Sequence, residues 1–587
     1  MVAAKKADFA GIGSELGVDP VIVRIMRNRG MTTIDEMRAF LNKYDCALTD
    51  PYLLPDMDKA VDIIRKKIAD GMSIRVIGDY DVDGVTSTVI LYKGIKALGG
   101  QVSYAIPNRI TDGYGINESM IENAYENGVD TVITCDNGIA ASSAIEKAKG
   151  YGMTVVVTDH HEVPYTEKDG KRIYVYPPAD ALMDPKIPDC GYPGPGICGA
   201  MVAYKFISVM RKACPDGEEL ISHGLMRELE ELAGLGTVCD VMELVGENRT
   251  VVSNAIKHMN DSANIGIRAL RKVCGIEDKP VNAHELGFIT GPCINATGRL
   301  DSADMSVELL LSEDIKEAVI KATELKNLND LRKGYTETGE KNALDYINDN
   351  GIDKDRVMIV YLPDLHESLA GIVAGRIKER FYRPVIVFTD SEDGIKGSGR
   401  SIEAYNMYEE LNKCRELYSK FGGHAMAAGL SLPSENLKIF KERLLNSCSL
   451  SDDDMTKKIM IDVPMPLYYV TEELTASLHL LEPFGTGNPK PVFATGGLRI
   501  LSVRTMGKTG DMCRLNVADE SGKRYELVMF NGYKKLKTEA EELYGDDGLT
   551  DSLIDIIYYP DINEYNGRRN LQFIVNECRF TRQDKGE

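Results

Sequence analysis

Tryptophan is absent from the 587 residues, and histidine is scarce, with 8 residues of which two are adjacent. A side chain that stacks on a nucleobase must therefore be tyrosine, phenylalanine, histidine or arginine. The 12 cysteines are scattered and form no Cys-x-x-Cys pair. That spacing argues against a zinc knot, and thiols in apolar contexts such as Cys135, Cys239 and Cys513 are predicted to be reduced and structural.

Long apolar runs are missing as well. No segment approaches the roughly 20 apolar residues that span a bilayer, and the N-terminus lacks the continuous apolar core of a signal peptide. The sequence therefore predicts a cytoplasmic protein with no membrane partner. Positive charge is in deficit, with 69 Lys and Arg against 90 Asp and Glu and a net charge of −21. This balance argues against a broadly basic surface, but it leaves room for a local basic groove.

Alternating patterns divide the chain, which is too long for one hydrophobic core. Between about residues 55 and 165, strand-like runs alternate with helical segments, which predicts an α/β fold with a parallel sheet. A second α/β unit begins near Val357, and five short strand-like runs at the end suit a β-barrel such as an OB-fold. The predicted divisions are an N-terminal helical cap (1–50), a parallel-sheet domain (51–315), a connecting helix (316–349), a second α/β domain (350–455) and the barrel (456–587).

Acidic residues and histidines gather directly behind apolar segments, most of them predicted strands. These residues are Asp79, Asp81, Asp83, Asp136, Asp159, His160, His161 and Asp240. Ligands of parallel α/β sheets bind at the carboxyl ends of the strands. Carboxylates that converge there repel one another unless a cation neutralises them. The pattern predicts one assembled divalent-metal site.

The predicted metal ligands are Asp81, Asp83, Asp136, His160 and Asp240. Oxygen and nitrogen donors without a thiolate favour Mn²⁺ or Mg²⁺ over a structural zinc site. Four carboxylates exceed what one hard cation needs, so two ions about 3.5–4 Å apart are expected, with Asp136 as the simplest bridge. Such a pair suits displacement at phosphorus, because one ion generates hydroxide and both stabilise the developing charge.

Three further groups complete the predicted catalytic set. Asp159 is expected to orient His160 as a hydrogen-bond acceptor, and His161 to hydrogen-bond a phosphate oxygen or the leaving group. Two roles are left open for Asp79: it is either a metal ligand or a residue that shapes the loop. A single Asp-x-Asp-Gly turn or a single His-His pair is common without a metal, so the joint spacing is what favours the site.

Two glycine-bearing segments follow in the second α/β unit, Lys396–Ser401 and Phe421–His424. Glycines let a backbone approach phosphate closely, and arginine and serine side chains supply hydrogen bonds to it. Each segment is a weak signal alone, because glycine-rich turns are common.

Together these residues resemble a known family, the DHH phosphoesterases, and within it the RecJ single-strand-specific exonucleases. The matching segments are Gly78–Gly84, Asp136–Gly138, Asp159–His161, Leu235–Asp240 with Gly246–Arg249, Pro292–Arg299, Ser398–Arg400, Gly422–His424 and Glu482–Pro489. By this resemblance the parallel-sheet domain is a DHH domain, the second α/β unit is a DHHA1 domain, and the barrel is an OB-fold.

The resemblance implies processive 5′-to-3′ degradation of single-stranded DNA to mononucleotides, dependent on Mn²⁺ or Mg²⁺. It implies roles in recombination and repair, with a helicase and a single-strand-binding protein as candidate partners. The expected nucleic-acid contacts are Arg109, Arg299, Arg376, Ser398, Arg400, Gly422, Gly423 and His424. Candidates for base stacking in the barrel are Tyr525, Phe530, Tyr565 and Phe573.

Two positions depart from the relatives. Pyrophosphate-hydrolysing relatives carry histidine where this chain has Ile77, which cannot bind a metal, so that branch is disfavoured. RecJ members commonly carry arginine where this chain has Cys293, so one phosphate contact is missing or supplied elsewhere. Two alternative functions stay open: a phosphodiesterase for short oligoribonucleotides or cyclic dinucleotides, and a non-catalytic DNA-binding replication scaffold. The barrel weighs against the first, and the five retained ligands weigh against the second.

Overall fold

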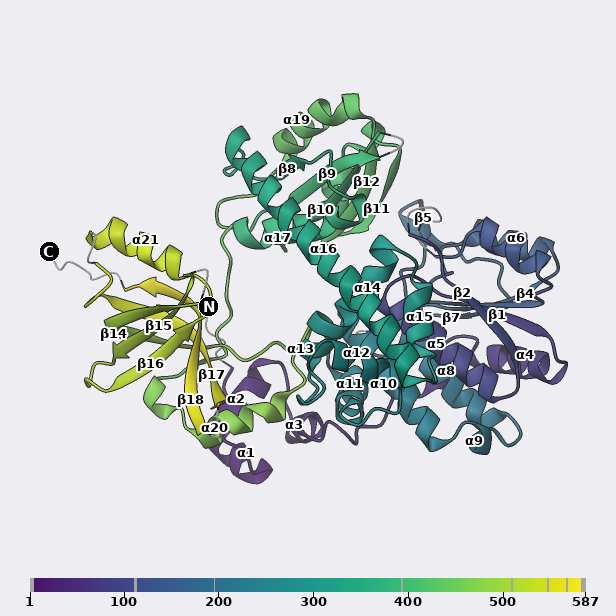
Figure 1. The fold of residues 1–587 in the computed structure, drawn as a ribbon, viewed down its shortest axis with the longest axis horizontal. Coiled ribbons are helices and arrows are strands. Elements are labelled where there is room, and N and C mark those ends of the chain that lie inside the picture. Colours follow the sequence, from purple (N-terminus) through teal and green to yellow (C-terminus); the bar gives the residue numbers. More distant parts are fainter. Residues whose placement is uncertain are drawn as a thin grey trace. The chain divides into compact units, whose positions relative to one another are not determined.

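The computed structural model describes residues 5–581 apart from 110–112, 114, 195, 392–393, 508–509, 546–547 and 566–567. The chain forms two compact units (Figure 1). The larger unit contains Thr49–Met242 and Asn254–Lys457, and the smaller unit contains Met1–Leu48, Glu243–Ser253 and Lys458–Glu587. Within the described ranges, we find no helix with both the length and the apolar character needed to cross a membrane.

A five-stranded parallel sheet begins the larger unit, in the order β2-β1-β3-β4-β7. Its strands are β1 (Ser73–Ile77), β2 (Gln101–Ala105), β3 (Thr131–Cys135), β4 (Thr154–Thr158) and β7 (Ala181–Met183). The packed helices are α4 (Met57–Ala69), α5 (Val82–Ala97), α6 (Glu118–Glu126), α7 (Ser142–Gly150) and α8 (Gly199–Ala213). Because helices cover the sheet, all five residues of the central strand β3 are buried. The predicted parallel α/β fold is confirmed.

An exposed hairpin and a helical layer follow. The hairpin strands are β5 (Tyr165–Lys168) and β6 (Lys171–Tyr174), and the layer contains α9 (Gly217–Leu220), α10 (His223–Cys239), α11 (Gly246–Met259), α12 (Ile265–Val273), α13 (Ala283–Glu285), a π-helical segment (Leu286–Thr290), α14 (Gly291–Leu300) and α15 (Asp304–Leu310). Next, α16 (Ile315–Asn350) runs as one helix of 36 residues. Asp314 begins it by accepting hydrogen bonds from two backbone N–H groups, and Gly351, at φ 62°, ends it in the left-handed conformation.

A second five-stranded sheet completes the larger unit, in the order β11-β12-β10-β9-β8. Its strands are β8 (Met358–Tyr361), β9 (Val385–Ser391), β10 (Gly394–Arg400), β11 (Lys420–His424) and β12 (Ala427–Leu432), and its helices are α17 (Ala370–Phe381), α18 (Met407–Asn412) and α19 (Leu437–Ser447). Alternate strand residues enter two cores: Val360 and Val387 pack with α16 and α17, whereas Ile359 and Phe388 pack with α19. Both glycine-bearing segments lie mainly in strands, β10 and β11, which pair with β12 from either side.

The smaller unit joins the two ends of the chain in one core. Helices α1 (Phe9–Leu16), α2 (Pro20–Asn28) and α3 (Ile34–Leu41) pack with the strands β14 (Phe493–Met506), β15 (Met512–Ala518), β16 (Arg524–Met529), β17 (Leu553–Tyr565) and β18 (Arg568–Phe580). Pairing of β14 with β17 and of β16 with β18 closes a five-stranded barrel, as predicted. The helices expected as an N-terminal cap therefore belong to the barrel's core.

Arg249 links a third segment of the chain to this unit. The guanidinium is 2% exposed and donates hydrogen bonds to the carbonyl oxygens of Leu480 and Leu481. It also lies 3.7 Å from the centre of the Phe40 ring. The segment Gly246–Arg249, which the resemblance grouped with the fourth motif, thus has a structural contact inside the smaller unit.

The barrel aromatics divide between core and surface. Phe573 is 6% exposed and meets the ring of half-buried Tyr525 edge-on, with centroids 6.0 Å apart, so both fill the core. Phe530 is 47% exposed and stays available for stacking. The side chain of Tyr565 lies outside the described residues.

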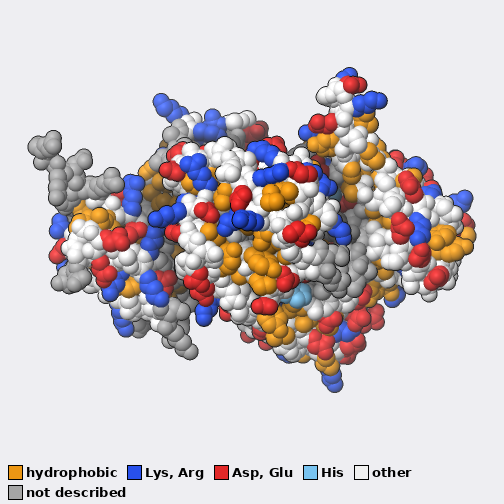
Figure 2. All heavy atoms as spheres, turned by 90° about the horizontal axis from the view of Figure 1, so that it is seen from above, with side chains coloured by type: hydrophobic (Ala, Val, Ile, Leu, Met, Phe, Trp, Pro, Cys, Tyr) orange, Lys and Arg blue, Asp and Glu red, His pale blue; other side chains and the backbone are white. Residues whose placement is uncertain are grey.

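Surface charge is mixed. On the face drawn in Figure 2, acidic and basic side chains are interspersed, with no continuous basic band among the coloured residues. This agrees with the net charge of −21 and with the expectation that basic character is local.

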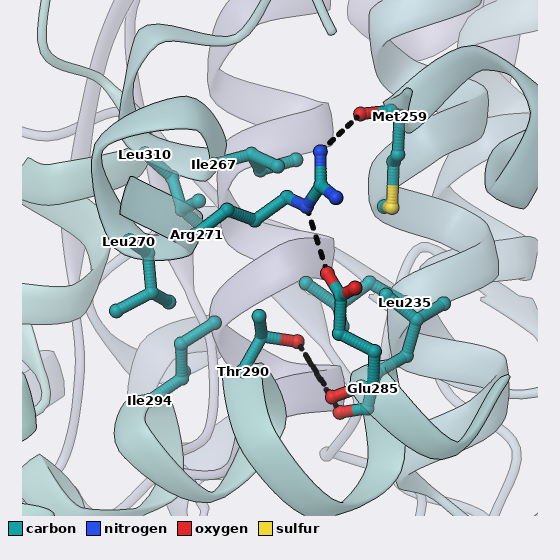
Figure 3. Close-up of a pocket in the computed structure, with 10 residues that line it drawn as sticks. Leu235, Met259, Ile267, Leu270, Arg271, Glu285, Thr290, Ile294 and Leu310 are labelled. Atoms are coloured by element: carbon teal, nitrogen blue, oxygen red, sulfur yellow. Dashed lines mark hydrogen bonds and ion pairs between the residues drawn. The ribbon is translucent and has the colours of Figure 1, made fainter. Parts of the chain in front are cut away.

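A polar pair lies buried in the helical layer (Figure 3). Nε of Arg271 is 2.8 Å from Oε1 of Glu285, with side chains 7% and 5% exposed. The other guanidinium nitrogens donate to the carbonyl oxygens of Met259, Ile276 and Lys279. Because every guanidinium nitrogen has an acceptor, the pair is tolerated out of water.

Removing one partner of this pair should destabilise the larger unit. Arg271→Met leaves the Glu285 carboxylate buried without its cation, which is expected to lower the free energy of unfolding by about 3–5 kcal/mol. Urea denaturation measures the loss. Arg227→Met is the matched control, because the Arg227 side chain is 43% exposed. A loss no larger than that of the control would contradict this account.

Candidate metal centre

The loop after β1 places three carboxylates close together. Asp81 caps α5, where its Oδ1 accepts a hydrogen bond from Gly84 N at 3.1 Å, and Asp83 lies in the first helical turn. Asp79 is fully buried and accepts from Gly115 N at 3.2 Å. A Cβ at Gly84 would meet the Asp79 backbone at 2.5 Å, so the tight turn requires glycine there.

The other groups arrive from neighbouring strand ends and from α10. Asp136 follows β3, His160 and His161 follow β4, and Asp240 ends α10. His160 Nε2 lies 2.9 Å from Asp136 Oδ1, 3.5 Å from Asp83 Oδ2 and 3.7 Å from Asp240 Oδ2. Three sets of donor atoms each lie within 4.8 Å: Asp136, His160 and His161; Asp83, His160 and Asp240; and Asp79, Asp81 and Asp136. Asp136 belongs to two of these sets, as a ligand that bridges two ions would.

Burial makes this cluster unfavourable without a cation. Burial, reinforced by the neighbouring Asp83 and Asp81, raises the pKa of Asp136 well above its usual range. Burial and adjacent carboxylates also raise the pKa of Asp79 and of Asp240 to about 8. A divalent cation removes the repulsion, and oxygen donors with imidazole suit Mn²⁺ or Mg²⁺. The residues present therefore fit these metals.

The two histidines differ in charge state. Burial lowers the pKa of His160 to about 4, so its ring is neutral, as a metal ligand must be. Burial acts to lower the pKa of His161, but Asp159 prevails and raises it to about 9. The His161 side chain is also the more exposed, 38% against 7%. His161 is therefore the imidazolium that a substrate can reach.

The expected pairing of Asp159 with His160 is wrong. Asp159 Oδ1 lies 2.8 Å from Nδ1 of His161, and its contact with His160 is to the backbone N–H at 2.7 Å. The His160 ring turns instead to Asp136. The reason is geometric: Oδ2 of Asp159 accepts from Ile139 N, and this fixes the carboxylate beneath the second histidine.

The N-terminal end of α8 stabilises the Asp83 carboxylate. Its two oxygens accept from Gly199 N at 2.6 Å and Ala200 N at 2.9 Å, in the first turn of α8. The positive end of the helix dipole favours a carboxylate there. A Cβ at Gly199 would meet Asp136 Cβ at 2.7 Å, and one at Gly236 would meet Asp83 Oδ1 at 2.7 Å. These glycines let α8 and α10 approach the site.

Sequence reasoning missed one acidic residue, Asp184. It directly follows β7 and is fully buried, and its Oδ2 lacks a hydrogen-bond partner among the described residues. Burial, with Asp159 nearby, raises its pKa to about 8. The same rule of a carboxylate behind a strand could have found it, but the strand Ala181–Met183 has only three residues and gives a weak sequence signal.

Three predicted arginines gather beside the centre. The Arg109 guanidinium lies 4.9 Å from the centre of the Tyr80 ring. Burial lowers the pKa of Arg299 to about 10, and burial also lowers that of Arg400; in both cases Arg109 adds repulsion. Arg299 Nη1 donates to the carbonyl oxygen of Ser368 at 2.9 Å. Mutually repelling, partly buried cations mark a site that an anion would stabilise.

Arg332 of α16 is a further cation that sequence reasoning missed. It lowers the pKa of Arg299, and Arg376 in turn adds to the lowering that burial causes in the pKa of Arg332. Arg376 itself pairs with Glu340 at 2.7 Å. Cys293, where the family resemblance led us to expect arginine, is 1% exposed and lies near Arg332. Arg332 therefore offers a positive charge where Cys293 cannot.

The remaining predicted contacts lie on the second sheet. Ser398 and Arg400 stand two residues apart on β10, joined by a hydrogen bond of 3.5 Å. His424 is exposed on β11. Gly423, at φ 152°, would bring a Cβ within 2.5 Å of Ala427 O, so the approach of β12 already explains this glycine. Around Gly422 the space is open.

Comparison with known proteins matches this arrangement along the chain. Family models match the DHH family N-terminal domain at residues 73–237, the DHHA1 domain at 354–449 and the RecJ OB domain at 461–577. Fold and site together define a metal-dependent phosphoesterase of the DHH class.

Single relatives narrow the class. The chain is 33% identical over 569 residues to the single-stranded-DNA-specific exonuclease RecJ of Bacillus subtilis, covering 96% of this chain and 68% of that protein. It is 33% identical over 576 residues to Escherichia coli RecJ, covering 95% of each. The crystal structure of Thermus thermophilus RecJ in complex with Mn²⁺ matches with a TM-score of 0.81 and 26% identity, over 99% of this chain and 79% of that one. The chain belongs to the RecJ family.

The metal-free protein should lose stability as the pH rises from about 4 to about 8. Asp79 and Asp240 have folded pKa values of about 8 against an ordinary 3.8, so their neutral forms stabilise the fold below the ordinary pKa. This contribution is lost as the pH rises through the folded pKa. Bound Mn²⁺ replaces the protons, so the melting temperature gained over EDTA should grow across the same range.

Thermal unfolding at about pH 5.5 and about pH 8, with Mn²⁺ or with EDTA, measures this trend. Asp136→Asn should flatten it, whereas Asp58→Asn, on the exposed side of α4, should not. An equal Mn²⁺ effect at both pH values would contradict the expected metal centre.

Proposed function

We propose that this protein hydrolyses single-stranded DNA from the 5′ end and releases mononucleotides. The observation that carries the proposal is the convergence of carboxylates and imidazoles beside a cluster of partly buried arginines. Membership of the RecJ family supports the substrate and the polarity. Action in the cytoplasm, in recombination and repair, alongside a helicase and a single-strand-binding protein, belongs to the same proposal and rests on the family alone.

In this proposal five side chains hold two Mn²⁺ or Mg²⁺ ions: Asp81, Asp83, Asp136, His160 and Asp240. When bound, the ions supply hydroxide at neutral pH and stabilise negative charge on the phosphoryl group. Asp136 would bridge the two ions, because its carboxylate offers two oxygens and belongs both to a set with His160 and to the set with Asp81. Asp79 holds the loop through its hydrogen bond from Gly115 N and borders the site.

His161 acts on the phosphate. Its imidazolium, kept protonated by Asp159, donates a hydrogen bond to a non-bridging oxygen or gives a proton to the leaving 3′ oxygen. Asp159 is a positioning residue, since its contacts are with His161 and with backbone N–H groups. This assigns proton transfer and metal binding to different histidines.

The arginines hold the strand. Arg109, Arg299 and Arg400 bind phosphates nearest the centre, because their mutual repulsion is relieved by an anion. Arg376, Ser398, Gly422, Gly423 and His424 extend this surface over the second α/β domain. Phe530 offers an exposed ring for a base in the barrel.

Two alternatives are less well supported. A phosphodiesterase for dinucleotides has no use for a barrel, and the RecJ OB domain matches residues 461–577. A non-catalytic scaffold has no use for metal ligands, and all five side chains converge here. Oligonucleotides labelled at the 5′ or the 3′ end, single- or double-stranded, as DNA or RNA, with Mn²⁺ or EDTA, test the proposal. Labelled mononucleotide released first from the 3′ end, or EDTA-resistant activity, would refute it.

Asp136→Asn and His161→Gln should fail in different ways. Loss of the bridging carboxylate should abolish both Mn²⁺ binding and hydrolysis, because it touches both ions. Loss of the His161 imidazolium should lower turnover by about 10²–10⁴-fold while Mn²⁺ binding persists. Calorimetry with Mn²⁺, single-turnover cleavage and melting curves separate the two. A His161→Gln protein that no longer binds Mn²⁺ would make this histidine a ligand.

Arg400→Ala should weaken binding of single-stranded DNA and reduce its salt dependence. Removing one cation that neutralises a phosphate lowers the slope of log K against log salt by about 0.7 for single strands. Arg443→Ala is the control, since Arg443 is a half-exposed cation paired with Glu416 on the same domain. Fluorescence anisotropy with inactive Asp136→Asn protein, from low to physiological salt, gives both slopes. Identical slopes for the two variants would remove Arg400 from the groove.

A further inference from the structure

Two thiols of the larger unit are in contact. Cys274 ends α12 and Cys293 lies in the first turn of α14, and their Sγ atoms are 3.9 Å apart. Cys293 is 1% exposed, whereas Cys274 is partly exposed. A small oxidant can therefore reach the sulfur of Cys274, and the sulfur of Cys293 lies beside it.

The surroundings make the two thiols unequal. The contact with Cys293 lowers the pKa of Cys274, and the cations Lys326 and Lys333 of α16 add to this against the effect of burial. The same contact, together with burial, raises the pKa of Cys293. Thiolate character determines which cysteine is attacked first by an oxidant. Cys274 is thus the reactive thiol, and Cys293 is its partner.

Helix α14 connects this pair to the metal loop. Oδ1 of Asn295, two residues after Cys293, accepts a hydrogen bond from Val82 N at 3.2 Å, between two predicted metal ligands. A Cβ at Gly298 would meet the carbonyl oxygen of Tyr80 at 2.5 Å, so helix and loop touch. The next residue, Arg299, carries one of the cations of the groove. A shift of α14 would therefore displace both the metal-binding loop after β1 and the guanidinium of Arg299.

We propose that Cys274 and Cys293 form a reversible disulfide in response to hydroperoxides, and that this disulfide lowers nuclease activity by shifting α14. The second half rests on the proposed function. The sulfur atoms must close from 3.9 Å to about 2.05 Å, the length of the bond. The ends of α12 and α14 must move together to allow it.

The chemistry balances with hydrogen peroxide as oxidant. The Cys274 thiolate attacks one peroxide oxygen, the O–O bond breaks, and a sulfenic acid and hydroxide form. The Cys293 sulfur then attacks the sulfenic sulfur, the S–O bond breaks, and the displaced oxygen leaves as water with the thiol proton. Two thiols and one peroxide thus give one disulfide and two waters. A dithiol reductant reverses the change by thiol–disulfide exchange.

The experiment treats the full-length, Mn²⁺-loaded protein with hydrogen peroxide, blocks free thiols, and divides the sample. One half goes to non-reducing peptide mapping, and the other to cleavage of a single-stranded oligonucleotide. The expected result is a cross-linked peptide pair containing Cys274 and Cys293, lighter by two hydrogen atoms. Activity should fall by about 2- to 30-fold, the range of coupling through packed elements, and return with dithiothreitol.

Cys274→Ser should keep the basal activity and resist peroxide. Cys214→Ser, which removes another partly exposed thiol, should stay as sensitive as the unaltered protein. If peptide mapping finds no Cys274–Cys293 link, the thiol site is wrong. If the link forms and activity stays constant, coupling through α14 is wrong. If the untreated protein does not cleave DNA, the proposed function fails, and peptide mapping still decides the thiol site.

Discussion

Repulsion between buried carboxylates is the constraint on which the rest of this structure depends. Four strand ends and the end of α10 bring seven carboxylates close together, and all but two of them are buried: Asp79, Asp83, Asp136, Asp159 and Asp184 are buried, and Asp81 and Asp240 are partly exposed. Burial and neighbouring carboxylates raise the pKa of Asp136 well above its usual range and that of Asp240 to about 8. The fold tolerates the cluster because helix ends, backbone N–H groups and a divalent cation share the charge.

The arginine cluster has the opposite charge, and it is unfavourable for the same reason, because like charges lie close together. Arg109 repels both Arg299 and Arg400, and burial removes hydration from the latter two, so the protein holds them at a cost in free energy that a polyanion removes. A protein with a net charge of −21 therefore still contains a local group of arginines that a bound phosphate would stabilise. The two clusters adjoin, and their needs are complementary: a divalent cation neutralises the carboxylates, and a phosphodiester neutralises the arginines.

The sequence was most informative where chemistry follows topology. Carboxylates behind apolar strands predicted the gathering of Asp81, Asp136 and His160, because parallel strands end at one edge of a sheet. The barrel and the long helix α16 were likewise visible as changes of hydrophobic period. No such rule decides which of two adjacent histidines meets Asp159, since the answer depends on where Ile139 N holds the carboxylate. Asp184 was not predicted as a site residue, because the strand before it is only three residues long.

The smaller unit also draws its core from both ends of the chain, and this has a consequence during synthesis. The larger unit is complete once residue 457 has been made, and every predicted metal ligand precedes residue 241. Val21, Ile22 and Ile25 of α2, by contrast, find their partners only in segments that are synthesised after residue 457. The metal centre can therefore fold on a nascent chain while α2 still exposes an apolar face, and an exposed apolar face favours aggregation until the barrel strands are made.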